Sequence, residues 1–376
     1  MTGNFRTGAI AIAVAATSTL FIVGCDDDDD NFVVTPPPAD GGGSTPEPGV
    51  SARCFDRIDL VSDQPGVAAR VDPDLVNAWG IAPALGAFWI ANAGTGRLSE
   101  LDATGAPART AGAPIDLGAG ITGIVANPST AFVIQCAEGP TPTALIVARE
   151  TGELIAINDD VNATTRSTVV VNRASLDANY KGVAILSSRD VMYLLAADFH
   201  NGRVDVFDET FTLSTQLAFV DPTIPAGFAP FNVAVLGDAV YVAYAQQDAA
   251  AEDEVRGAGL GYVTKFDRTG VRAWTLTSQL LNAPWGMVLA PTTTGLPANT
   301  LLVGNFGDGR ISTVDALTGR ELGQLEDASA APITIDGLWG LSFGDGVAQA
   351  DPNGLYFAAG PENEAHGLYG VLRPCQ

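Results

Sequence analysis

The stretch Ala197–Asp208, with the sequence ADFHNGRVDVFD, contains the clearest sign of the fold. Its Asn201-Gly202 pair is typical of a two-residue type I′ turn, which needs positive φ at both central residues. The flanking segments, VMYLLAA before the turn and RVDVF after it, have the composition and alternation of β-strands. The stretch therefore predicts a β-hairpin.

Related hairpins recur along the chain, at Phe88–Asp102 (FWIANAGTGRLSELD) and at Leu301–Asp315 (LLVGNFGDGRISTVD). A second element recurs with them, a residue followed by Gly that opens a short apolar strand. Its copies are Trp79-Gly80, Thr122-Gly123, Lys181-Gly182, Phe231-Asn232 (without Gly), Trp285-Gly286 and Trp339-Gly340. Repetition at intervals of roughly 40–60 residues indicates one supersecondary unit copied six times.

Each copy contains the pattern of four antiparallel strands, so the sequence predicts an all-β fold, a six-bladed β-propeller of four-stranded blades. The 42 Gly and 23 Pro residues fit such a division into short segments. Pairing of Cys54–Leu60 with the last strand would close the ring and remove a free sheet edge. It would also bring Cys54 near Cys375, and we predict a disulfide between them with Cys136 left as a buried thiol. A Cys54–Cys136 bridge and the absence of any bridge remain alternatives.

The segment before the propeller has the features of an export signal. An apolar run from Ala9 to Val23 is followed by Gly24-Cys25, which resembles the lipobox of bacterial lipoproteins. We therefore expect a signal peptide over 1–24, lipid attachment at Cys25, an acidic and Pro/Gly-rich tether over 25–50, and the propeller over 51–376. A chance cysteine in an ordinary signal peptide is the alternative. The resemblance implies an exported protein held on the bacterial cell envelope, on its periplasmic or outer-membrane face.

The formal net charge of −24 argues against nucleic-acid binding, because an acidic surface repels phosphate backbones. We expect a monomer that contacts a membrane only through its lipid and binds a small molecule or an envelope protein.

The candidate site lies at the mouth of the central channel, where the hairpins and the starts of the first strands meet. The residues expected there are Trp79, Trp285, Trp339, Asp198, His200, Asn305, Asp308, Glu362, Glu364 and His366. Copies three and six face each other in a six-fold ring, so Asp198, His200, Glu362 and His366 are candidate metal ligands. The alternatives are that the histidines are turn residues and that the tryptophans pack between blades.

Copy four carries an acidic insertion at Ala245–Gly261. It either holds Ca²⁺, folds as a lid or forms a short acidic surface helix; its spacing matches no EF-hand, which favours the helix. Nucleotide-binding, serine-hydrolase, CxxC and zinc-protease motifs are all missing from the sequence, so no catalytic residue is assigned.

Several longer strings resemble an uncharacterised family of exported bacterial propeller proteins. They include ANYKGVA at Ala178–Ala184, PAGFAPFNV at Pro225–Val233, APWGMVLAP at Ala283–Pro291 and GPENEAHGLYG at Gly360–Gly370. More distantly the blades are similar to NHL and SMP-30-like propellers, some of which are Ca²⁺-dependent lactonases, although no ligand set of those enzymes matches residue by residue. The leading hypothesis is a lipid-anchored, non-catalytic binding module. The alternative is a Ca²⁺-dependent, lactonase-like hydrolase.

Overall fold

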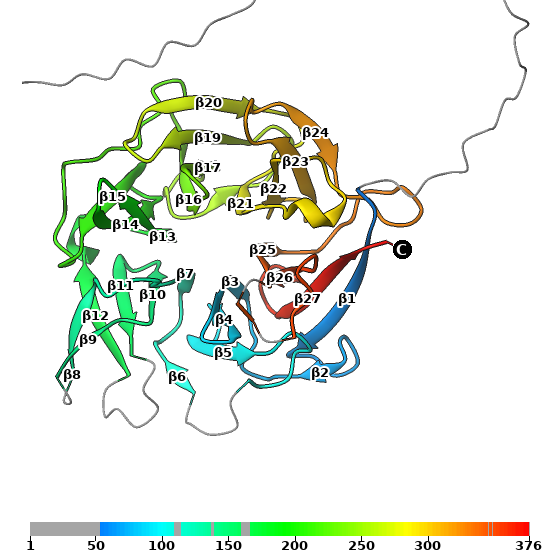
Figure 1. Ribbon diagram of the computed structural model, residues 1–376, viewed down its shortest axis with the longest axis horizontal. Helices are drawn as coiled ribbons and strands as arrows, with labels where there is room; N and C mark the ends of the chain where they lie inside the picture. Colours follow the sequence, from blue (N-terminus) through cyan, green and yellow to red (C-terminus); the bar gives the residue numbers. More distant parts are fainter. Residues whose placement is uncertain are drawn as a thin grey trace, which may run out of the picture. The chain divides into compact units, whose positions relative to one another are not determined.

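Six small sheets surround a central axis in the computed structural model of the protein (Figure 1). The structure describes residues 53–108, 114–136, 139–158, 166–344, 346–347 and 349–375. All of these residues lie in one compact unit, Gly49–Gln376. The predicted all-β class and six-bladed propeller are confirmed.

The expected signal peptide, the Cys25 lipid site and the tether lie outside the described residues. Within the described ranges, no helix combines the length and apolarity needed to cross a membrane.

The blades are numbered I to VI in chain order of their innermost strands. Blade I contains β3 (Ala78–Ala84), β4 (Ala87–Asn92), β5 (Arg97–Leu101) and β6 (Ile115–Asp116); blade II contains β7 (Ile121–Ala126), β10 (Leu145–Arg149), β11 (Glu153–Ile157) and β12 (Ser167–Asn172); blade III contains β13 (Tyr180–Ser188), β14 (Val191–Asp198) and β15 (Arg203–Asp208). Blade IV contains β16 (Phe228–Leu236), β17 (Ala239–Gln247), β18 (Glu254–Val255), β19 (Gly261–Asp267) and β20 (Arg272–Thr277); blade V contains β21 (Pro284–Leu289), β22 (Thr300–Asn305), β23 (Ile311–Asp315) and β24 (Glu321–Gln324). Blade VI contains β25 (Leu338–Phe343), β26 (Leu355–Ala359), β27 (Leu368–Pro374), β1 (Phe55–Ser62) and β2 (Arg70–Val71). A separate hairpin is formed by β8 (Val133–Cys136) and β9 (Gly139–Pro142). Two short 3₁₀ helices span Ala174–Leu176 and Thr292–Thr294.

Blade III departs from the predicted four strands, because its described residues form a sheet of three. The segment after β15 makes only an isolated bridge between Leu213 and Phe207. It then buries Leu217 and Phe219 in the core between blades III and IV. Blade III is therefore completed by side chains that pack against blade IV, and not by the backbone hydrogen bonds of a fourth strand.

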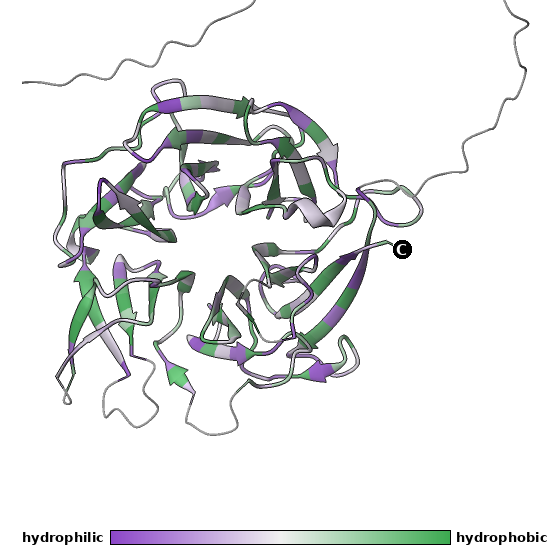
Figure 2. Cartoon of the chain, in the orientation of Figure 1, coloured by the Kyte–Doolittle hydropathy of each residue, from purple (hydrophilic) through white to green (hydrophobic). Residues whose placement is uncertain are grey.

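The core is divided into one hydrophobic cluster for each pair of neighbouring blades, and Figure 2 shows hydrophobic residues in the strands of every blade. Trp89, for example, packs with Val147 between blades I and II. A seventh cluster, centred on Trp339, lies near the axis. Because no blade has a core of its own, stability depends on completing the ring.

The ring is closed by the two ends of the propeller. β1 pairs antiparallel with β27, with Ile58 opposite Val371. A disulfide joins Cys54 to Cys375, with 5.4 Å between their Cα atoms. The free Cys136 is only half-buried, so the expectation of a buried thiol is wrong; its Sγ accepts a hydrogen bond from Asn158 Nδ2 at 3.2 Å.

The repeated glycines lie where neighbouring innermost strands approach most closely. A Cβ on Gly340 would stand 2.6 Å from the Trp79 carbonyl oxygen, and one on Gly80 would stand 2.6 Å from the Thr122 carbonyl oxygen. In copy four, Asn232 replaces the glycine and its Nδ2 donates to the Trp285 carbonyl at 2.7 Å. The motif recognised in the sequence is therefore a requirement of blade-to-blade contact.

We predict that Gly340→Ala destabilises the propeller by about 1–3 kcal/mol, because the added methyl group meets backbone that cannot move without opening the ring. Urea unfolding followed by circular dichroism would measure the change. Gly257→Ala is the control, since its Cβ would meet only the flexible Leu260 side chain. Equal midpoints for the two variants would contradict the packing argument.

Candidate functional site

The hairpins between second and third strands lie on the same face as the starts of the innermost strands. Backbone hydrogen bonds join the two regions: Ala93 N donates to Asn77 O at 2.9 Å, and Phe199 N donates to Asn179 O at 2.8 Å. The face expected from the sequence, called here the hairpin face, is therefore formed.

An aromatic cluster closes the channel near this face. Trp339 is fully buried and stacks on Trp79 and Phe306, with ring centroids 3.8 and 3.7 Å apart. Trp285 packs edge-on against Trp339 at 5.9 Å. We call these four residues the aromatic plug. Because they stack on one another, Trp79, Trp285 and Trp339 form no open floor for a flat ligand on this face, as the packing alternative expected.

A buried lysine lies beside the plug. The Lys181 side chain is 1% exposed, and its Nζ lies 5.3 Å from the centroid of the Trp79 ring. It contacts Glu150 Oε1 at 2.5 Å and Asp253 Oδ1 at 3.4 Å. Burial opposes the positive charge, but Glu150, Asp253 and Glu254 outweigh it and raise the pKa of Lys181. The ammonium group therefore stays charged and holds blades II, III and IV together.

Two further carboxyl groups approach the lysine. The Glu254 side chain is 8% exposed, and burial raises its pKa to about 7 although Lys181 and Arg256 oppose the shift. The pKa of Glu364 is raised by burial and then by Glu150. Arg256 lies over the Phe306 ring, with Cζ 4.1 Å from its centroid. Carboxyl groups from three blades therefore share two cations here, and at least one of them is readily protonated.

A polar cavity of the hairpin face lies next to this cluster, with a volume of about 530 Å³. We call it the acidic pocket, and its lining residues are Glu150, Thr151, Ala174, Asp177, Ala178, Asn179, His200, Glu252 and Asp253. Asn179 is only 8% exposed, and its Oδ1 is buried without a hydrogen-bond partner. Its Nδ2 donates to the Glu252 carbonyl at 3.1 Å. The pocket therefore presents four carboxylates, from Glu150, Asp177, Glu252 and Asp253.

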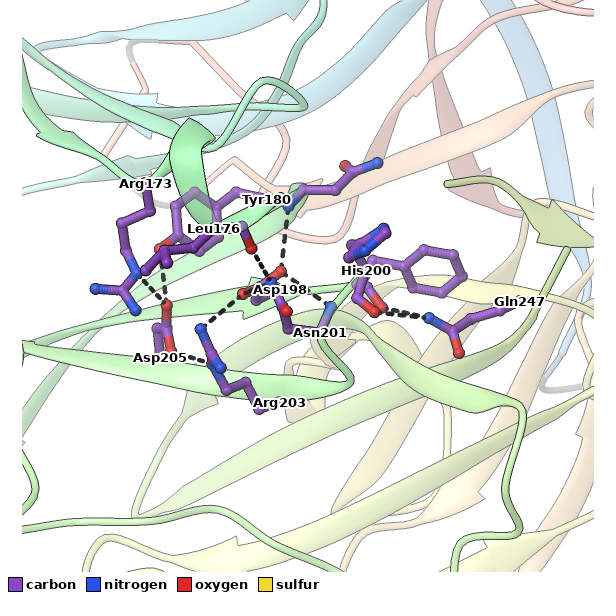
Figure 3. Close-up of polar contacts among 11 residues, drawn as sticks. Arg173, Leu176, Tyr180, Asp198, His200, Asn201, Arg203, Asp205 and Gln247 are labelled. Atoms are coloured by element: carbon purple, nitrogen blue, oxygen red, sulfur yellow. Dashed lines mark hydrogen bonds and ion pairs between the residues drawn. The ribbon is translucent and has the colours of Figure 1, made fainter. Parts of the chain in front are cut away.

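The stretch that revealed the fold uses most of its polar groups to hold its own hairpin, as Figure 3 shows. Asp198 is fully buried and accepts hydrogen bonds from Asn179 N at 3.1 Å and from Asn201 Nδ2 at 2.9 Å. Arg203 approaches Asp198 at 3.3 Å and Asp205 at 2.7 Å. Asp198 is therefore a structural residue rather than a ligand.

His200 and His366 do not form the expected site across the ring. His200 lines the acidic pocket, whereas His366 Nδ1 lies 2.8 Å from Asp63 Oδ2, a bond that raises the pKa of His366. Glu362, at 3.8 Å from His366 Nε2, is exposed. The described residues contain no group of three or more His, Cys, Asp or Glu side chains that could hold a metal ion. The proposed ligand set Asp198, His200, Glu362 and His366 is therefore not assembled among the described residues.

The other two hairpin residues named from the sequence are also structural. Asn305 is fully buried, accepts from Asn282 N at 3.1 Å and donates to Leu280 O at 2.8 Å. Asp308 accepts from Arg310 N at 3.1 Å inside its own turn. Both belong to the blade framework.

The acidic insertion of blade IV supplies much of the site, but it is not the expected helix. Asp248 N donates to Asp253 O at 2.8 Å, which closes a turn, and β18 then pairs with the end of β17. The turn brings Asp253 to Lys181. Glu150 was missed in the sequence, although it occupies the blade II hairpin, where alignment with the other copies would have identified it.

The fold and this site define the protein as a six-bladed β-propeller with an acidic pocket on its hairpin face. No protein-family model matches the chain. The chain is 32% identical over 330 residues to Uncharacterized protein R648 of Acanthamoeba polyphaga mimivirus, covering 83% of this chain and 78% of that protein. It is 30% identical over 338 residues to Uncharacterized protein L690 of the same virus, covering 83% and 84%. The chain belongs to the family of these two proteins.

A solved structure similar to the propeller is the soluble aldose sugar dehydrogenase of Escherichia coli in its apo-form. It aligns with a TM-score of 0.50 at 12% identity, covering 85% of this chain and 100% of that chain. At this identity the similarity concerns the fold alone. The relatives are viral, so the expected exported bacterial family is not what the comparison found.

We predict that Glu254→Gln becomes progressively more stable than the wild type as pH rises from about 5 to about 8. Above pH ~4.5 the unfolded carboxyl group ionises while the folded one keeps its proton up to about pH 7, so wild-type stability falls across this window. The difference should reach up to ~3 kcal/mol. Urea unfolding at the two pH values would measure it. Glu209→Gln, at an exposed position, is the control, and a pH-independent difference for Glu254→Gln would refute the assignment.

Proposed function

We propose that this protein is a non-catalytic binding module whose acidic pocket takes a small cationic ligand, a primary amine or a guanidinium compound. The observation that carries the proposal is the chemistry of the pocket wall. Glu150, Asp177, Glu252 and Asp253 line the pocket, and their carboxylates can accept hydrogen bonds. A ligand that brings several N–H donors and a positive charge complements such a wall.

Electrostatics supports the same ligand class. Lys181 neutralises only part of the charge of the four carboxylates, and its ammonium group is buried beneath Glu150 and Asp253. The net charge of −24 adds an attractive long-range field for cations. The volume of about 530 Å³ lies within the range of about 300–1,000 Å³ found for small-molecule sites.

We further propose that the propeller is exported as a monomer and held at the cell envelope by a lipid on Cys25. The Cys54–Cys375 disulfide supports an oxidising compartment, in which such bridges persist. The Gly24-Cys25 sequence after an apolar run supports the lipid attachment.

The ligand proposal predicts saturable binding of agmatine, which carries an amine and a guanidinium group, to the full-length protein by isothermal titration calorimetry. Glu252→Gln/Asp253→Asn should weaken binding at least tenfold, because both side chains are exposed on the pocket wall, and Glu150 still pairs with Lys181 in this variant. Added salt should weaken binding in the wild type.

The matched control is Asp190→Asn/Asp238→Asn, which removes two charges from turns between first and second strands. It should leave the affinity within twofold. Equal loss in both double variants would show that only net charge matters and would contradict a pocket. Lactone hydrolysis that requires Ca²⁺ would instead favour the lactonase-like hydrolase.

The lipid proposal predicts that the full-length protein expressed in a bacterium incorporates an alkyne-labelled fatty acid and enters the detergent phase on partition. Cys25→Ala should abolish both, while Cys136→Ser should change neither. Labelling that persists in Cys25→Ala would place the lipid on another residue, and absence of labelling in the wild type would overturn the lipid proposal.

A further inference from the structure

On the far side of the aromatic plug, the central channel forms a second cavity of about 660 Å³, called here the axial cavity. The innermost strands of all six blades line it. In blade II the lining runs from Gly123 to Ala126, in blade IV from Asn232 to Leu236, and in blade V from Trp285 to Val288. The cavity therefore begins beside the plug and extends along the strands away from the hairpin face.

The side chains that line this cavity are almost all aliphatic. Among its lining residues the only polar side chains besides Trp285 are Asn232 and Ser342. Asn232 Nδ2 donates to Trp285 O at 2.7 Å, and its Oδ1 accepts from Val233 N at 2.8 Å. Ser342 Oγ donates to the Phe343 carbonyl at 3.0 Å. Both side chains already bond to backbone, so the polar groups that remain in the wall belong to the backbone of the innermost strands.

Several aliphatic side chains of the wall, among them Ile81, Val125 and Val235, remain only half-buried. Covering exposed apolar area stabilises a complex by roughly 25 cal/mol per Å² before the entropy of association is counted. The chemistry of the wall thus favours an uncharged apolar molecule.

The dimensions of the cavity indicate the shape of that molecule. A lining of three to five residues per strand gives a depth of about 7–13 Å at ~3.3 Å per residue. The volume of about 660 Å³ then leaves a cross-section of about 50–95 Å², or a width of about 8–11 Å. Carbon atoms in contact lie about 3.5–4.0 Å apart. One extended hydrocarbon chain is therefore too narrow to contact all sides of the cavity, whereas a ring system is wide enough.

We propose that the axial cavity is a binding site for a compact, uncharged, ring-containing apolar molecule. The site is separate from the acidic pocket, because the aromatic plug lies between this end of the channel and the hairpin face. It does not depend on the cationic ligand proposed above, and either site can fail without the other.

The test is fluorescence titration of the full-length protein with N-phenyl-1-naphthylamine, a neutral aromatic probe. We expect saturable enhancement with one site per chain, displacement by naphthalene, and energy transfer from the tryptophans of the plug to the bound probe. Ala234→Trp should weaken binding at least tenfold, because Ala234 lines the cavity and is half-buried, so a large side chain there occupies the space. Ala328→Trp, at an exposed position in the loop after β24, is the matched control and should remain within twofold.

Circular dichroism reports whether each variant is folded. If Ala234→Trp unfolds, Ala126→Trp tests the same loss of binding from blade II, because Ala126 also lines the cavity. Enhancement that does not saturate in the wild type would overturn the proposal. Equal affinities in the cavity-filled and control variants would overturn it as well. Displacement by palmitate at lower concentration than by naphthalene would show that the occupant is a single chain and not a ring system.

Discussion

The close approach of neighbouring innermost strands is the constraint on which the rest of the structure depends. Six blades meet around one axis, and their first strands come so near that a Cβ at Gly80 or Gly340 would collide with the backbone of the next blade. All hydrophobic clusters except the axial one lie between blades, so no blade is stable without its neighbours. Closure by β1 and β27, with the disulfide beside them, completes the last interface.

The same geometry divides the channel into two chemically different ends. The aromatic plug fills the narrow end, where Trp339 stacks between Trp79 and Phe306. Beside it on the hairpin face, the hairpins differ in length and sequence between blades, and they supply Glu150, Asp253 and Glu364. On the far side of the plug, the innermost strands line the channel with aliphatic side chains. These side chains are aliphatic because they also pack against the cores between blades. Acidic loops and an apolar barrel wall thus follow from one architecture.

Polar residues at equivalent hairpin positions differ in whether they can bind a ligand. The difference depends on whether their side chains are already hydrogen-bonded within their own blade. Asp198 and Asn305 are fully buried and bonded to the segment that enters the first strand of their own blade. Glu150 and Asp253 instead bond to Lys181, a cation from another blade, and still line a cavity. The distinction between a framework residue and a site residue therefore depends on contacts between blades, which a repeat pattern does not reveal.

The sequence alone determined the all-β class, the number of blades, the hairpin face and the pairing of the chain ends, because the hairpin glycines and the close-approach glycines are local requirements that repeat. The turn at Asn201-Gly202 is not the predicted two-residue type, because Asp198 pairs with Arg203 across four residues and only Gly202 of the Asn-Gly pair has a positive φ. It placed Trp79, Trp285 and Trp339 at the channel correctly, yet could not show that they stack on one another. Only the tertiary structure decided that Asp198 is a framework residue, that His200 and His366 serve different neighbours, and that the insertion brings Asp253 to Lys181. These outcomes depend on which side chains from different blades come into contact. Burial and charge pairing between distant segments do not produce a repeating sequence pattern, so the sequence does not predict them.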